Sequence, residues 1–406
     1  MVTASIDFGT TNSVATLNIN GKIIPVKLGR DNTYTPTVLF FNFNDKKFYI
    51  GDEAIEQLED GELGRYFVSL KTFLGSKDEI EINLAYKRYK IEDLIAVILK
   101  RFKNEIDKLA NCDVKKLTLG RPVRFNDSDD RLDKLAQDRL KRAALKAGFK
   151  EINFCFEPIA AALSYKQNLS KDETILVADI GGGTTDYTII NLKSNNILST
   201  YGIYIGGNNF DSKIIREFIS PYLGEGIKYK NMGKDMHISH SLYVDLYEYY
   251  RFIKMYDKQI IDSIKKYIQM AYDKTAIKRL LELIEDGEYF NFINAIVDAK
   301  VSLSKNSNCL INMNFFEEPF SVKITQKEFN TITEEEIAKI KDALYKSLEI
   351  ANISPKKIDK VFLTGGTTLI PAVAEIYKEV FNSEKLIQTN VFSSVGYGLA
   401  LCNNLS

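Results

Sequence analysis

Two stretches of the chain combine an aspartate, glycines and threonines in an order suited to binding phosphate. In the first, a β-prone run leads into Asp7, and the turn that follows consists of Gly9, Thr10, Thr11 and Asn12. In the second, an apolar run leads into Asp179, and the turn consists of Gly181, Gly182, Gly183 and Thr184. Glycines allow positive φ and let a ligand approach the backbone closely. The N–H groups of such a turn form an anion site, and an aspartate beside it can hold the hydrated metal that accompanies a phosphate.

The order of strand, aspartate, glycine, two threonines and strand therefore occurs twice, which predicts two related lobes that each present a phosphate-binding turn. Taken alone, either stretch can also be interpreted as a glycine-rich hairpin with an acidic flank. Two glycine pairs, Gly206 with Gly207 and Gly365 with Gly366, each lead into a helical pattern. A helix N-terminus behind a glycine turn is suited to an anion or a nucleotide. The set predicts a nucleotide site in a cleft between the lobes.

Two charged residues stand out, although their local patterns alone do not assign them a function. Lys71 lies in the segment 66–74, which predicts a short helix, and a single lysine is usually a solvated surface residue. Glu157 follows a short strand and precedes Pro158, so it can be a helix N-terminal charge favoured by the macrodipole. His237 and His240, the two histidines, fall in the stretch 224–240, which we expect to be irregular.

The remaining pattern is that of an α/β protein with a helical insertion. Helical spacing covers 91–109, a polar helix extends to Lys146 before Gly148, and residues 241–304 are almost continuously helical in pattern. Residues 309–315 and 320–325 predict a hairpin. The four cysteines are scattered without a Cys-x-x-Cys pair, which argues against a zinc site and a disulfide framework and favours a reducing compartment.

Composition excludes several classes of function. The chain has 406 residues, is 45% hydrophobic, and carries 54 basic and 54 acidic residues. Because the net charge is zero, the charge balance favours neither nucleic acid nor an anionic membrane as a partner. No apolar run approaches the roughly 20 residues that span a bilayer. We therefore expect a cytoplasmic protein. The sequence contains neither a P-loop nor a dinucleotide-binding fingerprint.

Seven motifs, in order, resemble the ATPase domain of the heat-shock-70 (DnaK-like) chaperone family, which has the two-lobed actin/hexokinase-like fold. They are IDFGTTNSV, LKTFLG, FEPIAAALSY, LVADIGGGTTDYTII, IGGNNFD, AKVSLS and VFLTGGTTLIP. The resemblance covers essentially the whole chain. The segment GRPVRF and the inserted helices are most similar to the shorter YegD-like branch of the family.

The resemblance implies a role for each matching residue. Asp7, Asp179 and Glu157 match the metal site, mostly through water, and Thr10, Thr11 and the glycines 181–183 match the phosphate turns. Lys71 matches the lysine that positions the attacking water, Glu157 and Asp179 fix that water and the metal shell, and Thr184 completes the catalytic set. The positions that match the nucleoside site are Gly206, Gly207, Lys300, Ser304, Gly365, Gly366 and Leu369.

The implied function is slow Mg²⁺-dependent hydrolysis of ATP to ADP in a chaperone-like switch, with K⁺ as a candidate second ion and other chaperones or client proteins as partners. Pro122 matches a proline placed between the catalytic and partner-facing surfaces of the family. An actin-like filament protein, a phosphotransferase or exopolyphosphatase of the same fold, and a binding-only pseudo-ATPase are the alternatives. Leu369 replaces an arginine that stacks on adenine and Val297 replaces a glutamate at the nucleoside edge, which predicts weaker selectivity for adenine.

The implied organisation has two lobes. The first lobe is expected at 1–172 with 384–406, and 36–112 forms its smaller subdomain. The second lobe is expected at 173–383, and 219–306 forms its helical subdomain. Since the family's chain continues into a peptide-binding domain and this sequence stops at Ser406, we expect no peptide-binding domain in it.

Overall fold

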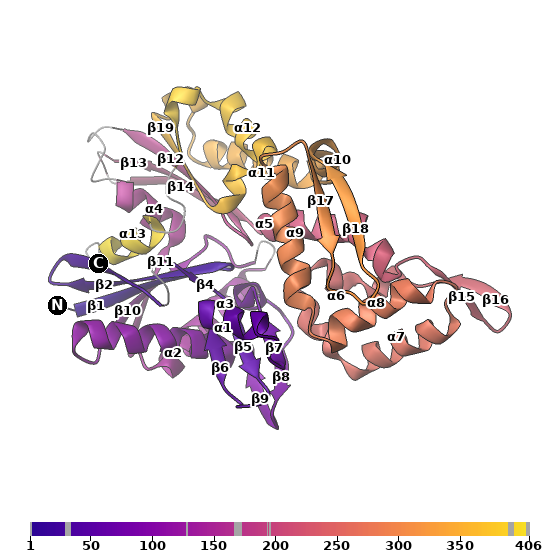
Figure 1. The fold of residues 1–406 in the computed structure, drawn as a ribbon. Helices are drawn as coiled ribbons and strands as arrows, with labels where there is room; N and C mark the ends of the chain where they lie inside the picture. Colours follow the sequence, from indigo (N-terminus) through magenta and orange to yellow (C-terminus); the bar gives the residue numbers. More distant parts are fainter. Residues whose placement is uncertain are drawn as a thin grey trace. The chain divides into compact units, whose positions relative to one another are not determined.

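The computed structural model describes residues 2–28, 34–126, 129–165, 173–192, 194, 196–388 and 394–402 (Figure 1). The chain divides into two compact units. Unit 1 contains residues 1–206, 339–369 and 373–406, and unit 2 contains residues 207–338 and 370–372. Among the described residues, no helix is both long enough and apolar enough to cross a membrane.

Two five-strand arrangements in unit 1 share one topology. In the first sheet the order is β3-β2-β1-β10-β11, and β4 also pairs with β2; in the second it is β14-β13-β12-β19-β20. In each, three antiparallel strands are followed by two parallel ones. The internal repetition predicted from the two turns is thus present in the strand order. The bounds in the first sheet are β1 Val2–Phe8, β2 Asn12–Ile19, β3 Lys22–Val26, β4 Thr35–Pro36, β10 Lys116–Arg121 and β11 Glu151–Phe156; in the second they are β12 Thr174–Ile180, β13 Thr185–Asn191, β14 Asn196–Ile203, β19 Lys360–Thr364 and β20 Leu386–Gln388.

Helices cover both faces of each sheet in unit 1, which explains the near-continuous burial of the central strands β1, β2, β12 and β13. Helices α2 (Ile91–Ala110) and α3 (Asp130–Ala147) pack together beside the first sheet. Helix α13 (Ser394–Cys402) packs on that sheet, and α4 (Glu157–Tyr165) packs on both α13 and the second sheet. Ala160, Val177 and Leu399 belong to the buried cluster that joins them. Helices α11 (Glu334–Ile350) and α12 (Pro371–Val380) contact the second sheet through Tyr187.

A smaller group of elements in unit 1 carries Lys71. Its bounds are β5 Leu39–Asn42, β6 Phe48–Ile50, α1 Asp52–Glu59, β7 Gly64–Phe67, the 3₁₀ helix η1 Leu70–Phe73, β8 Glu81–Leu84 and β9 Lys87–Lys90. Val38, Phe40 and Ala54 form its buried core. The short helix expected at 66–74 is wrong in part, because residues 64–67 pair with β5 as a strand and the helix begins at Leu70.

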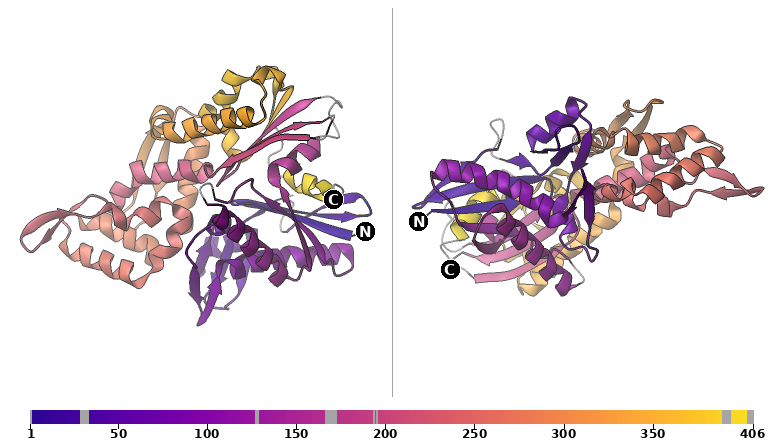
Figure 2. Two further views of the ribbon diagram at one scale, coloured as in Figure 1. Left: turned by 180° about the vertical axis from the view of Figure 1, so that it is seen from behind. Right: turned by 90° about the horizontal axis from the view of Figure 1, so that it is seen from below.

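Unit 2 consists of helices and two hairpins. Its bounds are α5 Gly207–Ile214, a π-helical turn η3 Ile215–Ile219, η4 Ser220–Leu223, β15 Lys228–Asn231, β16 Lys234–His237, η5 His240–Leu242, α6 Val244–Tyr247, η6 Tyr249–Tyr256, α7 Lys258–Met270, α8 Lys274–Glu285, α9 Tyr289–Leu303, β17 Asn308–Met313, β18 Phe320–Thr325 and α10 Gln326–Ile332. The predicted hairpin is confirmed as β17–β18. Residues 224–240 are not irregular: β15 and β16 form a hairpin that projects from the helices of this unit (Figures 1 and 2).

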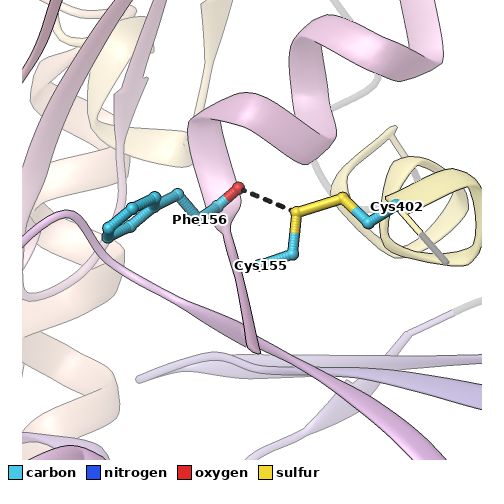
Figure 3. Close-up of a disulfide and its surroundings, with 3 residues drawn as sticks. All are labelled: Cys155, Phe156 and Cys402. Carbon is cyan, nitrogen blue, oxygen red and sulfur yellow. Dashed lines mark hydrogen bonds between the residues drawn. A yellow bond between two sulfur atoms is a disulfide. The ribbon is translucent and has the colours of Figure 1, made fainter. Parts of the chain in front are cut away.

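The scattered cysteines led us to expect no disulfide, and this is corrected by the fold. Cys155, in β11, and Cys402, at the end of α13, form a disulfide although 247 residues separate them. Figure 3 shows the bond, with the Cys155 sulfur 3.7 Å from the carbonyl oxygen of Phe156. Packing of α13 against α4 and the first sheet brings the two residues together, and sequence spacing carries no signal of that packing. Cys112 and Cys309 are free thiols.

Candidate active site

The two aspartates occupy equivalent places in the repeated sheets. Asp7 is the last residue but one of β1 and pairs with Val14, and Asp179 is the last residue but one of β12 and pairs with Asp186. Each strand then leads into a glycine turn and an antiparallel partner strand. In the second turn, the Gly181 N–H donates to the carbonyl of Thr184 at 3.0 Å. The repeated topology thus sets both carboxylates at the mouths of matching turns.

The tips of the two turns lie against each other. A Cβ placed on Gly183 would stand 3.2 Å from Oγ1 of Thr10 and 3.5 Å from Cγ2 of Thr72. In the first turn, Gly9 approaches the Asn12 carbonyl so closely that a Cβ would collide with it, and the carbonyl of Thr11 accepts the Thr37 N–H at 2.7 Å. The contact of Gly183 with Thr10 thus places the tips of the two turns next to each other.

Lys71 and Glu157 form a buried ion pair beside these turns. The Lys71 Nζ donates to Oε1 of Glu157 at 2.6 Å, and both side chains are at most 10% exposed. The backbone of η1 begins after Ser69, which adopts the left-handed conformation, and Glu157 is the first residue of α4. The sequence motifs predicted both residues as site residues, but no spacing rule pairs residues so far apart.

Asp7 lies close to this ion pair, because Gly120 has no side chain between the two carboxyl groups. A Cβ on Gly120 would lie 3.2 Å from Cγ of Glu157 and 3.3 Å from Oδ1 of Asp7. Gly120 lies in β10, which is the parallel neighbour of β1. The central strands of the first sheet thus bring Asp7 and Glu157 to the same point.

Asp186 is a fourth carboxyl group of the cluster, and the sequence reasoning did not include it in the site. Its side chain is 2% exposed, and Oδ1 accepts the N–H of Val123 at 2.8 Å. A Cβ on Gly202 would collide with that same oxygen. Its position seven residues after Asp179, across the hairpin, is the signal that could have identified it, because cross-strand partners share a face.

Mutual repulsion and burial shift the ionisation of the cluster. Burial, with Glu157 and Asp186 nearby, raises the pKa of Asp179 to about 8. Burial and Glu157 raise the pKa of Asp186 to about 7, against the opposing hydrogen bonds from Val123 and Thr184. Burial and Glu157 also raise the pKa of Asp7 well above its usual range. Burial disfavours the charged form of Lys71, but Glu157 and Asp7 outweigh it, so the pKa of Lys71 is raised.

The cluster fits a hydrated divalent cation. Four carboxyl groups lie around a single ammonium group, and burial, followed by the charge of Glu157, raises the pKa values of Asp7, Asp179 and Asp186, so a bound cation would favour their ionised forms. Among the described residues, no three histidine, cysteine or acidic side chains are close enough to ligate one ion directly. Mg²⁺ retains several of its waters and is usually held by one or two carboxylates together with phosphate oxygens. Asp7, Asp179 and Glu157 are the candidates for its outer contacts.

The candidate nucleoside residues of unit 1 gather behind the second turn. Gly365 has φ +85° and approaches Ile180 so closely that any side chain would collide with the Ile180 carbonyl. Thr367, in the 3₁₀ helix η8 (Gly366–Leu369), donates from Oγ1 to the carbonyl of Gly181 at 2.8 Å. Gly206 closely approaches the backbone of Gly181 and Gly182. Leu369, at the end of η8, is 57% exposed.

The candidate nucleoside residues of unit 2 form a group of their own. Lys300, in α9, donates from Nζ to Oδ2 of Asp211 at 2.7 Å and to the carbonyl of Gly207 at 3.3 Å. Ser304 donates to the carbonyl of Lys300 at 3.1 Å. The buried Asp211 was not predicted from the sequence, and it orients the lysine toward the N-terminus of α5.

The repeated sheets, each with a glycine turn after its central strand, define a duplicated α/β fold, and comparison with known proteins identifies the family. The Hsp70 family model, described as Hsp70 protein, matches residues 67–239 and 254–405. The chain therefore belongs to the Hsp70 family and has the actin/hexokinase-like fold of that family's ATPase domain.

Individual relatives are chaperone proteins DnaK. The chain is 26% identical to that of Thermosipho melanesiensis over 401 residues, 26% identical to that of Thermotoga petrophila over 408 residues, and 27% identical to that of Mycoplasmopsis agalactiae over 413 residues. Each comparison covers 98% of this chain and 58% of the relative. The chain thus spans a little over half the length of these relatives.

Proposed function

We propose that the chain binds ATP with Mg²⁺ at this cluster, hydrolyses it slowly to ADP and phosphate, and uses the nucleotide state to switch its affinity for a chaperone partner or client protein. The Lys71–Glu157 ion pair beside the facing turns is the observation that supports this proposal most directly. Membership of the Hsp70 family supports the choice of ATP. A YegD-like position within the family and K⁺ as a second ion remain predictions.

The proposed hydrolysis uses positioning and charge more than covalent chemistry, as phosphoryl transfer generally does. Backbone N–H groups of residues 9–12 and 181–184 bind the β- and γ-phosphates. Lys71 orients the attacking water and stabilises the charge that develops on the γ-phosphate. Glu157 holds the Lys71 ammonium in place and, with Asp179 and Thr184, keeps the water in line. When bound, Mg²⁺ neutralises phosphate charge.

The test compares ATP turnover of the wild type with that of Lys71→Ala. We expect a loss of at least one hundredfold, because charge stabilisation of this kind contributes about two to three powers of ten. Lys341→Ala is the matched control, since Lys341 forms a surface ion pair with Glu379 and should leave turnover unchanged. Equal rates for wild type and Lys71→Ala would overturn the proposed catalysis and favour a binding-only protein.

Two further measurements separate the alternatives with the same fold. Pelleting of the chain in ATP but not in ADP would assign it to filament-forming ATPases. Phosphorylation of a sugar, or release of phosphate from polyphosphate, would assign it to the phosphotransferases or exopolyphosphatases. A protein captured from a lysate in one nucleotide state and released in the other is the result expected for the proposed switch.

A further inference from the structure

Unit 2 contains a groove between α9 and β17 that the proposed ATPase does not use. Its volume is about 700 Å³, within the range of ligand-binding clefts. One wall is a stripe of α9 at the spacing of a single helix face, consisting of Asn291, Asn294, Ala295, Asp298, Ala299 and Ser302. Helix α9 and strand β17 lie side by side in Figures 1 and 2. The groove therefore runs along the helix rather than across it.

The other wall is the edge of β17 rather than one of its faces. Four consecutive residues, 309–312, line the groove. Successive side chains of a strand point to opposite faces, so a groove that touches every residue in turn must contact the backbone edge. The two-stranded sheet pairs β17 with β18 alone, which leaves this edge without a strand partner in the part of the chain that the structure describes.

The alternation of hydrogen-bonded and non-hydrogen-bonded residue pairs in the hairpin determines which backbone groups face the groove. The N–H of Gln326 donates to the carbonyl of Ser307 at 2.9 Å, and the register places these two residues opposite each other. Hydrogen-bonded and non-hydrogen-bonded pairs alternate in an antiparallel ladder. Cys309 and Ile311 therefore bond to β18, while the N–H and C=O groups of Leu310 and Asn312 point away from it. Neither of these residues forms a backbone hydrogen bond outside the ladder among the described residues.

We propose that the groove binds an extended segment of a partner protein, which adds to β17 as a third strand. A helix beside an exposed strand edge is the arrangement by which extended peptides are recognised: main-chain hydrogen bonds hold the peptide, and alternate side chains enter the space under the helix. Leu310 and Asn312 offer the main-chain groups. The Cβ atoms of Ala295 and Ala299 leave room for apolar side chains of modest size.

Charge specifies the occupant further. Asp298 alone is charged among the described residues that line the groove, and it is exposed. The other polar lining groups are amides and a hydroxyl, which bind either sign. A segment with one lysine or arginine flanked by alternating small apolar residues is therefore the favoured partner, and an acidic segment is disfavoured.

The test uses the full chain and a fluorescein-labelled nonapeptide that alternates valine with serine and carries one central arginine. Fluorescence anisotropy should report saturable binding. Leu310→Pro removes one outward N–H but no bond to β18, and proline is tolerated on a strand edge with that orientation. We expect it to weaken binding at least tenfold, whereas Leu310→Val changes binding less than twofold. N-methylation of the peptide along one edge should weaken binding as strongly.

A second variant distinguishes a specific loss of binding from misfolding. Asp298→Asn is a conservative substitution. We expect it to weaken binding of the arginine peptide threefold or more and to leave binding of a peptide with a central glutamine unchanged. Hydrogen exchange of the free chain should show fast amides at Leu310 and Asn312 and slow ones at Cys309 and Ile311, with the fast pair protected by peptide. No binding by either peptide, or equal binding to wild type and Leu310→Pro, would overturn the proposal. A dimer that Leu310→Pro dissociates would also overturn it, because the edge would then bind a second copy.

Discussion

The ammonium of Lys71 lies 2.6 Å from Oε1 of Glu157, across 86 residues of sequence and inside a cluster that also contains Asp7, Asp179 and Asp186. A single ammonium group thus lies among four carboxyl groups away from water, and three of these have raised pKa values. This imbalance makes the cluster a suitable place for a cation and a phosphorylated ligand, and it leads to measurable consequences for stability as well as turnover.

We expect Lys71→Met to destabilise the free protein by about 3 kcal/mol or more, because removing one partner of a buried pair leaves an uncompensated charge. Lys71→Met combined with Glu157→Gln should recover part of that loss. The two changes therefore couple, with an interaction energy of about 0.5–3 kcal/mol. Urea unfolding of the wild type, both single variants and the double variant measures this energy. Additive effects would contradict a direct interaction.

Asp179→Asn should abolish Mg²⁺-dependent turnover. The substitution removes a carboxyl group that can ionise beside a cation at the mouth of the second turn, while the amide retains nearly the same shape. Turnover measured across a range of Mg²⁺ concentrations distinguishes a weaker metal site from a general loss of activity. Full activity at the wild-type Mg²⁺ requirement would remove Asp179 from the metal site.

The stability of the nucleotide-free protein should respond to pH through Asp186. Its pKa of about 7 in the folded chain exceeds the ordinary value of 3.8, so the folded state binds the extra proton between these limits. The stabilising contribution is therefore fully present below about pH 3.8, is lost progressively as the pH rises to about 7, and changes no further above that. Asp186→Asn keeps the acceptor for Val123 but cannot ionise.

Melting temperatures in a metal chelator test this prediction. Asp186→Asn should melt near the wild type at pH 4 and become relatively more stable by several degrees at pH 7.5, since about 1 kcal/mol moves the midpoint by roughly 2–4 °C in a domain of 150–250 residues. Curves that stay parallel from pH 4 to 7.5 would show that Asp186 does not titrate in this window.

The Cys155–Cys402 disulfide should stabilise the oxidised chain. Its two cysteines are 247 residues apart in the sequence, and the loop-entropy model assigns about 5.5 kcal/mol to a loop of that size. Reduction should lower the melting temperature, and Cys402→Ser should melt like the reduced wild type under both conditions. Cys112→Ser, which changes an exposed free thiol, should keep the difference between oxidised and reduced forms. A wild type that melts identically in both forms would contradict the bond's contribution.

Local sequence was sufficient for the elements whose signals are local. The strand β12 that carries Asp179, the glycine turn after it and the hairpin β17–β18 follow from short-range propensity and glycine conformation. The repeated turn also predicted an internal repetition, and the two sheets share one strand order. The hairpin β15–β16 was missed because its strands are short and polar, and because most of its residues are exposed they carry no alternating apolar pattern.

The sequence by itself predicted the kind of site, because aspartates, glycines and threonines in that order suit a phosphate and a metal. The tertiary structure decided which groups share one environment. Parallel pairing of β1 with β10 and of β10 with β11 brings Asp7 to Glu157. Antiparallel pairing of β12 with β13 adds Asp186, and packing of α13 on α4 joins Cys155 to Cys402. These contacts depend on long-range strand register and helix packing, which no local pattern encodes.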